Sequence, residues 1–233
     1  MRLEETPMIR TVGLRKVYRS NGVETVALRG VELSVERGEF TAIVGPSGSG
    51  KSTLLHLLAG LDLPTEGEVY VAGVRVDRLS RAERARFRLF HVGSVFQAYN
   101  LLPVLTALEN AALLLELRGI PRPERERQAL SALEAFGLAD KARRRPAQLS
   151  GGEQQRVAVA RAMVAELLVV LADEPTANLD SKTGLDLIRH MKRLNERKHI
   201  TFLFSTHDPR LLEQVGRIVR LEDGTVVADE RRG

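Results

Sequence analysis

Apolar and polar residues alternate along the first part of the chain, which is the pattern of β-strands with one buried face. The alternation runs through residues 23–28 and again through residues 31–35. Asn21-Gly22 stands between two alternating runs, and this dipeptide is a strong hairpin signal. We therefore expect residues 8–36 to form a small antiparallel sheet.

Short, continuously apolar runs and segments of helical period predict an α/β domain for the rest of the chain. Buried strands are expected at residues 40–44, 91–96, 167–172 and 199–205, with shorter strands at 68–71 and 74–76. Helices are expected at residues 53–61, 80–90, 121–136 and 180–197, and a closing hairpin at residues 217–228. Strands that alternate with helices favour a mostly parallel sheet.

Helical signals dominate the region between residues 98 and 161. Thr106 and Ser150 each stand three residues before a glutamate, as Ser80 does earlier, and this is the spacing of a capping box. We predict one domain, in which residues 8–97 and 162–233 form the core and residues 98–161 form an inserted helical subdomain.

The composition suits one α/β domain and excludes several other classes. The chain has 233 residues, 43% of them hydrophobic, and no cysteine, so it has no disulfide framework and no thiolate zinc site. Its first residues lack the apolar segment of a signal peptide. The longest apolar run, residues 167–172, is far shorter than the ~20 residues of a membrane span. A membrane role is therefore expected to depend on a partner.

The net charge is +5 and the pI is near 9.9, which would suit nucleic acid or anionic lipid head groups. Composition alone is the simpler explanation, because 29 of the 35 basic residues are arginine and most are scattered. Two clusters stand out, at residues 78–88 and 143–145. No aromatic residues are interleaved to form a base-stacking surface, so no nucleic-acid partner is expected.

A glycine-rich loop with the pattern G-x-x-x-x-G-K-[ST] follows the strand expected at residues 40–44 and precedes a helix. Such a loop aims backbone N–H groups and the positive helix end at a polyphosphate. Lys51 is expected to bridge the β- and γ-phosphates, and Ser52 to ligate Mg²⁺. The residues assigned to nucleoside triphosphate are Gly45, Pro46, Ser47, Gly48, Ser49, Gly50, Lys51, Ser52 and Thr53.

Polar residues at the carboxyl ends of three further strands complete a catalytic set, because these ends meet at one crevice. Asp173 is expected to orient Mg²⁺, and Glu174 to polarise the attacking water as general base. Gln97 is a candidate for Mg²⁺ or the water, and His207 for the γ-phosphate. Tyr18 could stack on adenine or pack in the sheet, and its spacing does not decide between the two.

These motifs together resemble the ATPase subunit of ABC transporters over essentially the whole chain. Residues 149–156 match the ABC signature, residues 171–176 the second nucleotide motif, and residues 178–180 the loop that contacts the dimer partner. Within the resemblance, Gln97 is the glutamine-loop residue, His207 the switch histidine and Tyr18 the aromatic that stacks on adenine.

The resemblance implies a homodimer that forms on ATP binding and encloses two ATP molecules head to tail. Each nucleotide would lie between the Lys51 loop of one subunit and the signature of the other, a second anion site at a helix N-terminus. The residues assigned to this second half are Ser150, Gly151, Gly152, Glu153 and Asp180. The implied ligands are ATP and Mg²⁺.

Residues 95–103 and 171–180 are most similar to the MacB/LolD/FtsE-like branch of the family. Ala177 departs from the branch, which usually has glycine there, and so does Ala165-Glu166, which lacks the usual proline. The branch implies an exporter or lipoprotein-releasing ATPase at the cytoplasmic face of the inner membrane. An FtsE-like regulatory ATPase of cell division is the alternative, and a soluble ABC ATPase the less favoured one.

A separate membrane-spanning permease subunit is the partner that the resemblance implies, docking near the residues after Gln97. Tyr99, Leu101 and Leu102 would line the docking groove, although these apolar residues could instead pack the helical region. Cargo specificity would lie in that membrane subunit, so the transported substrate does not follow from this chain.

Overall fold

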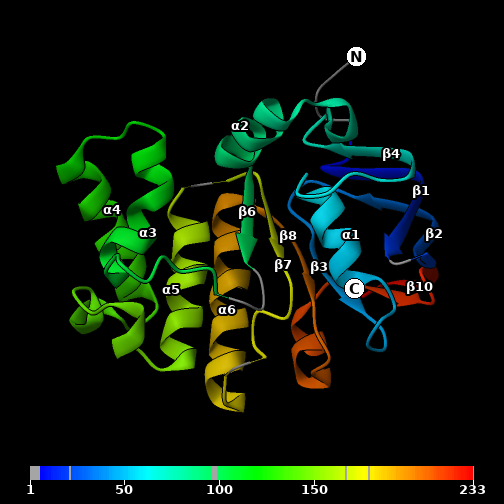
Figure 1. Ribbon diagram of the computed structural model, residues 1–233. Helices are drawn as coiled ribbons and strands as arrows, with labels where there is room; N and C mark the ends of the chain where they lie inside the picture. The colour runs from blue at the N-terminus through cyan, green and yellow to red at the C-terminus, as the bar shows by residue number, and fades with distance from the viewer. Residues whose placement is uncertain (1–5, 21, 96–98, 166, 178, 233) are drawn as a thin grey trace.

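The computed structural model describes residues 6–20, 22–95, 99–165, 167–177 and 179–232. Two sheets organise the molecule, with helix α1 (Lys51–Leu58) in contact with strands of both. Helices α3 (Ala107–Leu117), α4 (Arg122–Ala135) and α5 (Gly151–Val164) contact one another and lie on the side of the large sheet away from the small one (Figure 1). This is the α/β architecture that the sequence predicts, with a mostly parallel main sheet.

The smaller sheet is antiparallel, as the alternation predicts. Its strand order is β2-β1-β4-β5, and Ser20 pairs with Val23 across the hairpin turn. The strands are β1 (Ile9–Ser20), β2 (Val23–Val35), β4 (Glu66–Val71) and β5 (Val74–Arg75). Asn21 lies outside the described residues, and Gly22 has a φ of 78°, which glycine adopts without strain. The hairpin prediction is confirmed.

The larger sheet has the order β10-β9-β3-β8-β7-β6, in which only the β9–β10 pair is antiparallel. Its strands are β3 (Phe40–Val44), β6 (Val92–Val95), β7 (Val169–Ala172), β8 (Thr201–Ser205), β9 (Arg217–Glu222) and β10 (Thr225–Arg231). The carboxyl ends of β3, β7 and β8 therefore meet at one edge, where the predicted catalytic residues follow them.

Successive side chains of the larger sheet point to its opposite faces and contribute to two separate hydrophobic cores. On one face Ile43, Leu171 and Leu203 pack with α1 and the antiparallel sheet. On the other face Phe202 and Phe204 pack with residues of α3, α4, α5 and α6 (Ser181–Lys198). Because both faces are covered, these strands are continuously apolar rather than alternating, which explains their sequence signal.

All three predicted capping boxes form. Ser80, Thr106 and Ser150 each accept a hydrogen bond from the glutamate N–H three residues on, and cap α2 (Arg81–His91), α3 and α5 respectively. Short 3₁₀ turns occupy Val76–Arg78, Ala139–Lys141, Pro146–Gln148 and Pro209–Gln214. Helix α5 continues to Val164, past the boundary predicted near residue 161.

Several predicted element ends are wrong by one to three residues. The first helix begins at Lys51 and ends at Leu58, because the phosphate loop leads directly into it. His91 belongs to α2 rather than to the next strand, and β7 starts only at Val169. His199 is the left-handed C-cap of α6, with a φ of 52°, so it cannot extend a strand. Among the described residues, no helix combines the length and apolarity needed to cross a bilayer.

Candidate active site

The loop between β3 and α1 is a concave turn that depends on glycine. Gly45, Gly48 and Gly50 have φ angles of 153°, 80° and 103°. A Cβ on Gly45 would stand 1.9 Å from the carbonyl oxygen of Leu221, so no other residue fits there. The loop opens into the N-terminus of α1, where free N–H groups and the helix dipole favour an anion.

Lys51 lies inside this loop. Its Nζ donates to the carbonyl oxygens of Gly45 and Pro46, each at 2.8 Å, and the residue is buried. Burial lowers the pKa of Lys51, and the carboxylates of Glu174 and Asp173 oppose that shift. The loop thus holds a cation whose bonds to neutral carbonyls can be exchanged for bonds to phosphate oxygens, which are charge-assisted and stronger.

Ser205, the last residue of β8, joins the two acidic residues that follow β7. Its hydroxyl donates to Oδ1 of Asp173 at 2.6 Å and accepts from the backbone N–H of Glu174 at 2.8 Å. Glu174 has a φ of 49°, in the left-handed region that costs a non-glycine residue free energy. The sequence analysis did not identify Ser205, although a hydroxyl at the end of an apolar strand was a signal for it.

His207 approaches Glu174 from the end of β8. Its Nε2 lies 2.8 Å from Oε1 of Glu174, but that oxygen has no hydrogen-bond partner, so the contact is not aligned as a hydrogen bond. The Glu174 side chain is 15% exposed and that of His207 56%. Burial is the main cause that raises the pKa of Glu174, with Asp173 adding to it and His207 and Lys51 opposing it. A carboxyl with a raised pKa suits proton abstraction.

These residues share one cleft of about 340 Å³. Predicted residues from three strand ends meet there, with Ala27 and Ala177 completing the wall. The predicted residues that line it are Ser47, Gly48, Gly50, Lys51, Ser52, Thr53, Asp173, Glu174 and His207. The cleft therefore combines a phosphate-sized anion site with a candidate general base.

Replacing Glu174 by glutamine should raise the stability of the nucleotide-free protein by on the order of 1 kcal/mol at neutral pH, because it removes a buried, incompletely bonded charge. The pKa of Glu174 is higher in the folded than in the unfolded chain. Wild-type stability therefore falls as the pH rises from the unfolded pKa, about 4.3, through the raised folded pKa. The difference in Tm should be absent in acid and reach roughly 2–4 °C at neutral pH.

The exposed Glu222→Gln variant changes the net charge equally and is the matched control. A Tm difference between wild type and Glu174→Gln that does not change with pH would contradict the assignment of a raised pKa to Glu174.

The cleft fits Mg²⁺ held together with a nucleotide. Mg²⁺ is usually bound by one or two protein oxygens, with phosphates and waters supplying the rest. Ser52 and Asp173 provide a hydroxyl and a carboxylate on the same cleft, and Asp173 is already oriented by Ser205. Among the described residues there is no group of three or more His, Cys, Asp or Glu side chains that could hold a metal without a ligand's help. Gln97, the other predicted ligand, lies outside the described residues.

Tyr18 lies beside the cleft rather than in its wall. Its hydroxyl donates to Asp62 at 3.1 Å and also interacts with the Thr53 side chain, next to the phosphate loop. Lys16 Nζ lies 4.8 Å from the centroid of the Tyr18 ring, and Tyr18 is 40% exposed. The ring is thus held near the start of α1, with part of its surface open to solvent. Its predicted adenine contact stays a prediction.

The predicted signature residues lie at the N-terminus of α5 and do not line this cleft. Ser150 is exposed, and its hydroxyl accepts from the Glu153 N–H at 3.2 Å and also interacts with the Glu153 carboxylate. A Cβ on Gly151 would stand 2.8 Å from the Tyr99 hydroxyl. Asp180 caps α6, accepting from the N–H groups of Lys182 and Thr183, and does not line the cleft either. Asn178 lies outside the described residues.

A separate apolar groove of about 310 Å³ lies between α2, α3 and α5. Leu61, Leu89, Leu113 and Leu117 are among its lining residues, and Asn100 is the only residue of the segment 99–103 in its described lining. Tyr99, Leu101 and Leu102, which were predicted to line a docking groove, are not in the lining of this one, and their docking role stays a prediction. Leu101 packs against the core, Tyr99 faces Gly151, and Leu102 is exposed.

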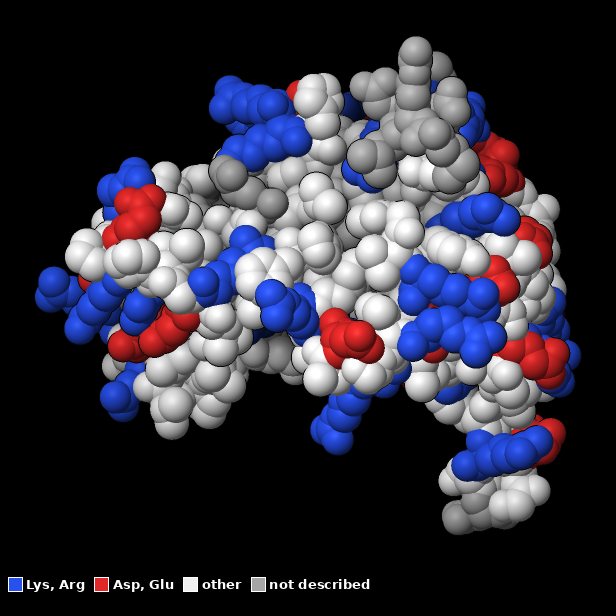
Figure 2. Space-filling model, turned by 90° about the horizontal axis from the view of Figure 1, so that it is seen from above, with Lys and Arg blue, Asp and Glu red and all other residues white. Residues whose placement is uncertain are grey.

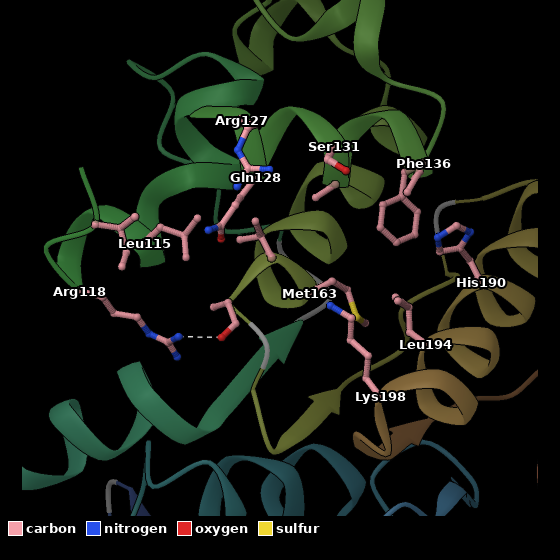
Figure 3. Close-up of a pocket in the computed structure, with 15 residues that line it drawn as sticks. Leu115, Arg118, Arg127, Gln128, Ser131, Phe136, Met163, His190, Leu194 and Lys198 are labelled. Atoms are coloured by element: carbon pink, nitrogen blue, oxygen red, sulfur yellow. Dashed lines mark hydrogen bonds between the residues drawn. The ribbon is translucent and has the colours of Figure 1, made fainter. Parts of the chain in front are cut away.

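A third, larger groove of about 600 Å³ lies between α3–α5 and α6 (Figure 3). Arg118 and Arg127 are among its cations, but both are already engaged. Arg118 donates to the carbonyl oxygen of Ala165 at 2.6 Å, and Arg127 pairs with Glu124 at 2.6 Å. Its described lining has no glycine-rich loop and no carboxylate, so the groove is not part of the phosphate site.

The comparisons with known proteins agree with one another on the family. The ABC transporter family model matches residues 28–177. The lipoprotein-releasing system ATP-binding protein LolD of Anaeromyxobacter dehalogenans is 48% identical over 225 residues, which cover 96% of this chain and 94% of that protein. The macrolide export ATP-binding/permease protein MacB of Nitrobacter winogradskyi is 45% identical over 223 residues, 96% of this chain but 34% of that protein.

Among solved structures, the ATP-binding cassette MJ0796 has the same fold. Its dimeric post-hydrolysis state, bound to ADP and Pi, aligns with a TM-score of 0.92 and 42% identity, over 97% of this chain and all of that chain. The fold is therefore that of an ABC cassette, with a mixed sheet, an N-terminal antiparallel sheet and a helical region.

Proposed function

This chain belongs to the ABC transporter ATP-binding family, and from that premise we propose that it is the ATP-hydrolysing subunit of a LolD/MacB-type system. It hydrolyses ATP with Mg²⁺ and drives a separate membrane subunit. The observation that carries the proposal is the single cleft that joins Lys51 to Asp173, Glu174 and His207.

In this site each residue has one task. Lys51 and the N-terminus of α1 hold the β- and γ-phosphates, while Ser52 and Asp173 hold Mg²⁺. Glu174 accepts the proton of the attacking water, and His207, which lies beside it, contacts the γ-phosphate. Ser205 fixes the carboxylate of Asp173 and the backbone of Glu174 relative to each other. Tyr18 stacks on the adenine.

The second half of the site is supplied by a second copy of the chain. The N-terminus of α5 presents the Ser150 hydroxyl and the N–H groups of Gly151 and Gly152, an anion site that the cleft of the same chain does not use. MJ0796 forms a dimer with ADP and Pi, which supports the same assembly here. Two copies arranged head to tail would place each α5 N-terminus over the partner's phosphate loop, with Asp180 near the contact.

The groove between α2, α3 and α5 receives a cytoplasmic segment of the membrane subunit. Support comes from its apolar lining and from Leu117, which is 62% exposed at its edge. Arg161 of α5 donates to the carbonyl oxygens of Tyr99 and Asn100 at 3.1 and 2.7 Å, so the segment beside the groove is tied to the signature helix. Docking of residues 98–161 as one helical subdomain would place the protein at the cytoplasmic face of the membrane.

Leu117→Glu should uncouple the protein from its membrane subunit while leaving the ATPase of the isolated chain within about twofold of wild type. The side chain is exposed, so a charge there costs little folding free energy, but it would be desolvated by a bound apolar segment. Co-purification with the membrane subunit measures the effect. Leu130→Glu, on α4 and 37% exposed, is the control. Equal retention of the partner by both variants would argue against this groove.

The experiment that tests the proposed function is capture of that partner. Tagged Glu174→Gln protein is expressed in its own host, ATP is added, and the solubilised membranes are searched for co-purifying chains. A membrane subunit with a large extracytoplasmic domain supports the LolD/MacB-type assignment. A many-spanning permease places the ATPase in another transporter branch, and recovery without any membrane protein contradicts the transport role.

A further inference from the structure

Helix α2 and the 3₁₀ turn that precedes it carry a group of arginines that the ATPase site does not use. Five arginines and one glutamate stand between residues 78 and 90. Phe87 is the only buried residue of the helix, so most of its surface is open to solvent. Figure 2 views the molecule from the end where α2 lies in Figure 1, and Lys and Arg side chains form several groups across that face.

Most of this positive charge is not neutralised locally. Arg78 has a side chain that is 76% exposed and stands 3.8 Å from Asp77, too far for a strong ion pair. In the described part of the chain, Arg81 and Arg86 form no ion pair with a carboxylate. Glu83 is held in the capping box with Ser80. The face therefore keeps a net positive charge that attracts an anionic surface.

An exposed aromatic residue lies among these cations. Phe90 is 41% exposed, and the guanidinium carbons of Arg86 and Arg118 lie 5.8 and 5.4 Å from its ring centroid. Arg118 is itself anchored to the carbonyl oxygen of Leu89, which fixes one of the two cations beside the ring. An aromatic ring flanked by arginines is suited to the boundary between lipid head groups and acyl chains.

We infer that this surface, formed by Arg78, Arg81, Arg86 and Phe90, binds the anionic phospholipid head groups of the membrane. The apolar groove supplies the orientation, because Ala85 and Leu89 of the same helix line it. The inference rests on the proposed function only for that orientation, since a segment of a membrane subunit seated in the groove brings α2 close to the bilayer. Each arginine near an anionic leaflet contributes about 1 kcal/mol, which is roughly fivefold in affinity.

The test is vesicle co-sedimentation of the full chain, with phosphatidylcholine alone and with roughly a third of phosphatidylglycerol added. Wild type should bind the anionic vesicles, and high salt should release it, because screening weakens exposed charges. Arg81→Glu/Arg86→Glu should bind at least about 20-fold more weakly. Arg81 is the first residue of α2, where a glutamate favours the helix dipole, so weaker binding is not explained by melting of the helix.

Arg143→Glu/Arg144→Glu is the matched control, because both pairs are exposed and each double reversal takes the net charge from +5 to 5 − 4 = +1. The control should bind like wild type, and the ATPase of both variants should be unchanged. Equal weakening by both pairs, or equal binding of wild type to neutral and anionic vesicles, overturns the inference. A further outcome is that wild type fails to bind anionic vesicles while Arg81→Glu/Arg86→Glu no longer co-purifies with the membrane subunit. In that case the arginines contact an acidic protein segment and the lipid assignment is wrong. Failure of partner capture with intact vesicle binding would instead count against the transport role.

Discussion

Glu174→Gln is expected to slow ATP hydrolysis by about 10²- to 10⁴-fold while leaving ATP binding intact. Glutamine keeps the shape of the side chain but cannot accept the proton of the attacking water. Lys51 and the N-terminus of α1, which are proposed to hold the phosphates, are unchanged by the substitution. ATP that is bound but not hydrolysed should keep two copies together, so size-exclusion chromatography with saturating ATP should show a dimer. Phosphate release under single-turnover conditions measures the chemical step.

Two further variants make this result specific. Glu222→Gln removes an exposed carboxylate that does not line the cleft and should hydrolyse ATP like wild type. Lys51→Ala introduced together with Glu174→Gln should stay monomeric, because the phosphate site has lost its cation. Unchanged hydrolysis in Glu174→Gln would exclude Glu174 as the base. A monomer at saturating ATP would count against the assembly of the site from two copies.

Gly152→Asp should reduce ATP hydrolysis and ATP-dependent dimerisation by at least on the order of 100-fold, although the phosphate loop is untouched. Two like charges about 4 Å apart near a protein surface repel by several kcal/mol, and the proposed assembly places residue 152 against the partner's nucleotide. Gly152 is the second residue of α5, where aspartate stabilises a helix better than glycine does. Loss of activity would therefore not come from a weaker helix. Dimerisation is best measured in the Glu174→Gln background.

Gly152→Asn separates charge from size, since asparagine has nearly the same shape without the charge. Gly152→Asn should still form most of the ATP-dependent dimer. ATP binding to the monomer should equal that of wild type in both Gly152→Asn and Gly152→Asp. If aspartate and asparagine have the same effect, the side chain acts by bulk and electrostatic contact with a nucleotide is not supported. If neither has an effect, the N-terminus of α5 does not meet the partner's site.

The sequence by itself determined the features of this protein that depend on neighbours a few residues away. The turn at Gly22 and the capping residues of α2, α3 and α5 require only local backbone geometry and hydrogen bonds that span two or three residues. The phosphate loop was predicted from the spacing of its own residues, although Gly45 also lies against the distant carbonyl oxygen of Leu221. The strands β3, β7 and β8 were also predicted from the sequence, because a strand that is buried on both faces has a continuous run of apolar residues. Strand ends were predicted less well, as His199 shows, since a helix cap and a strand start compete for the same residue.

Only the tertiary structure decided which distant residues meet. Ser205 reaches Asp173 across 32 positions of sequence, and Arg161 reaches the carbonyl oxygens of Tyr99 and Asn100 across about 60. The tertiary structure also decided that Ser150 lies away from the cleft of its own chain and that α2, α3 and α5 enclose a groove. Such contacts depend on how whole elements pack, and packing is fixed by the combined shape of two cores that no local pattern encodes.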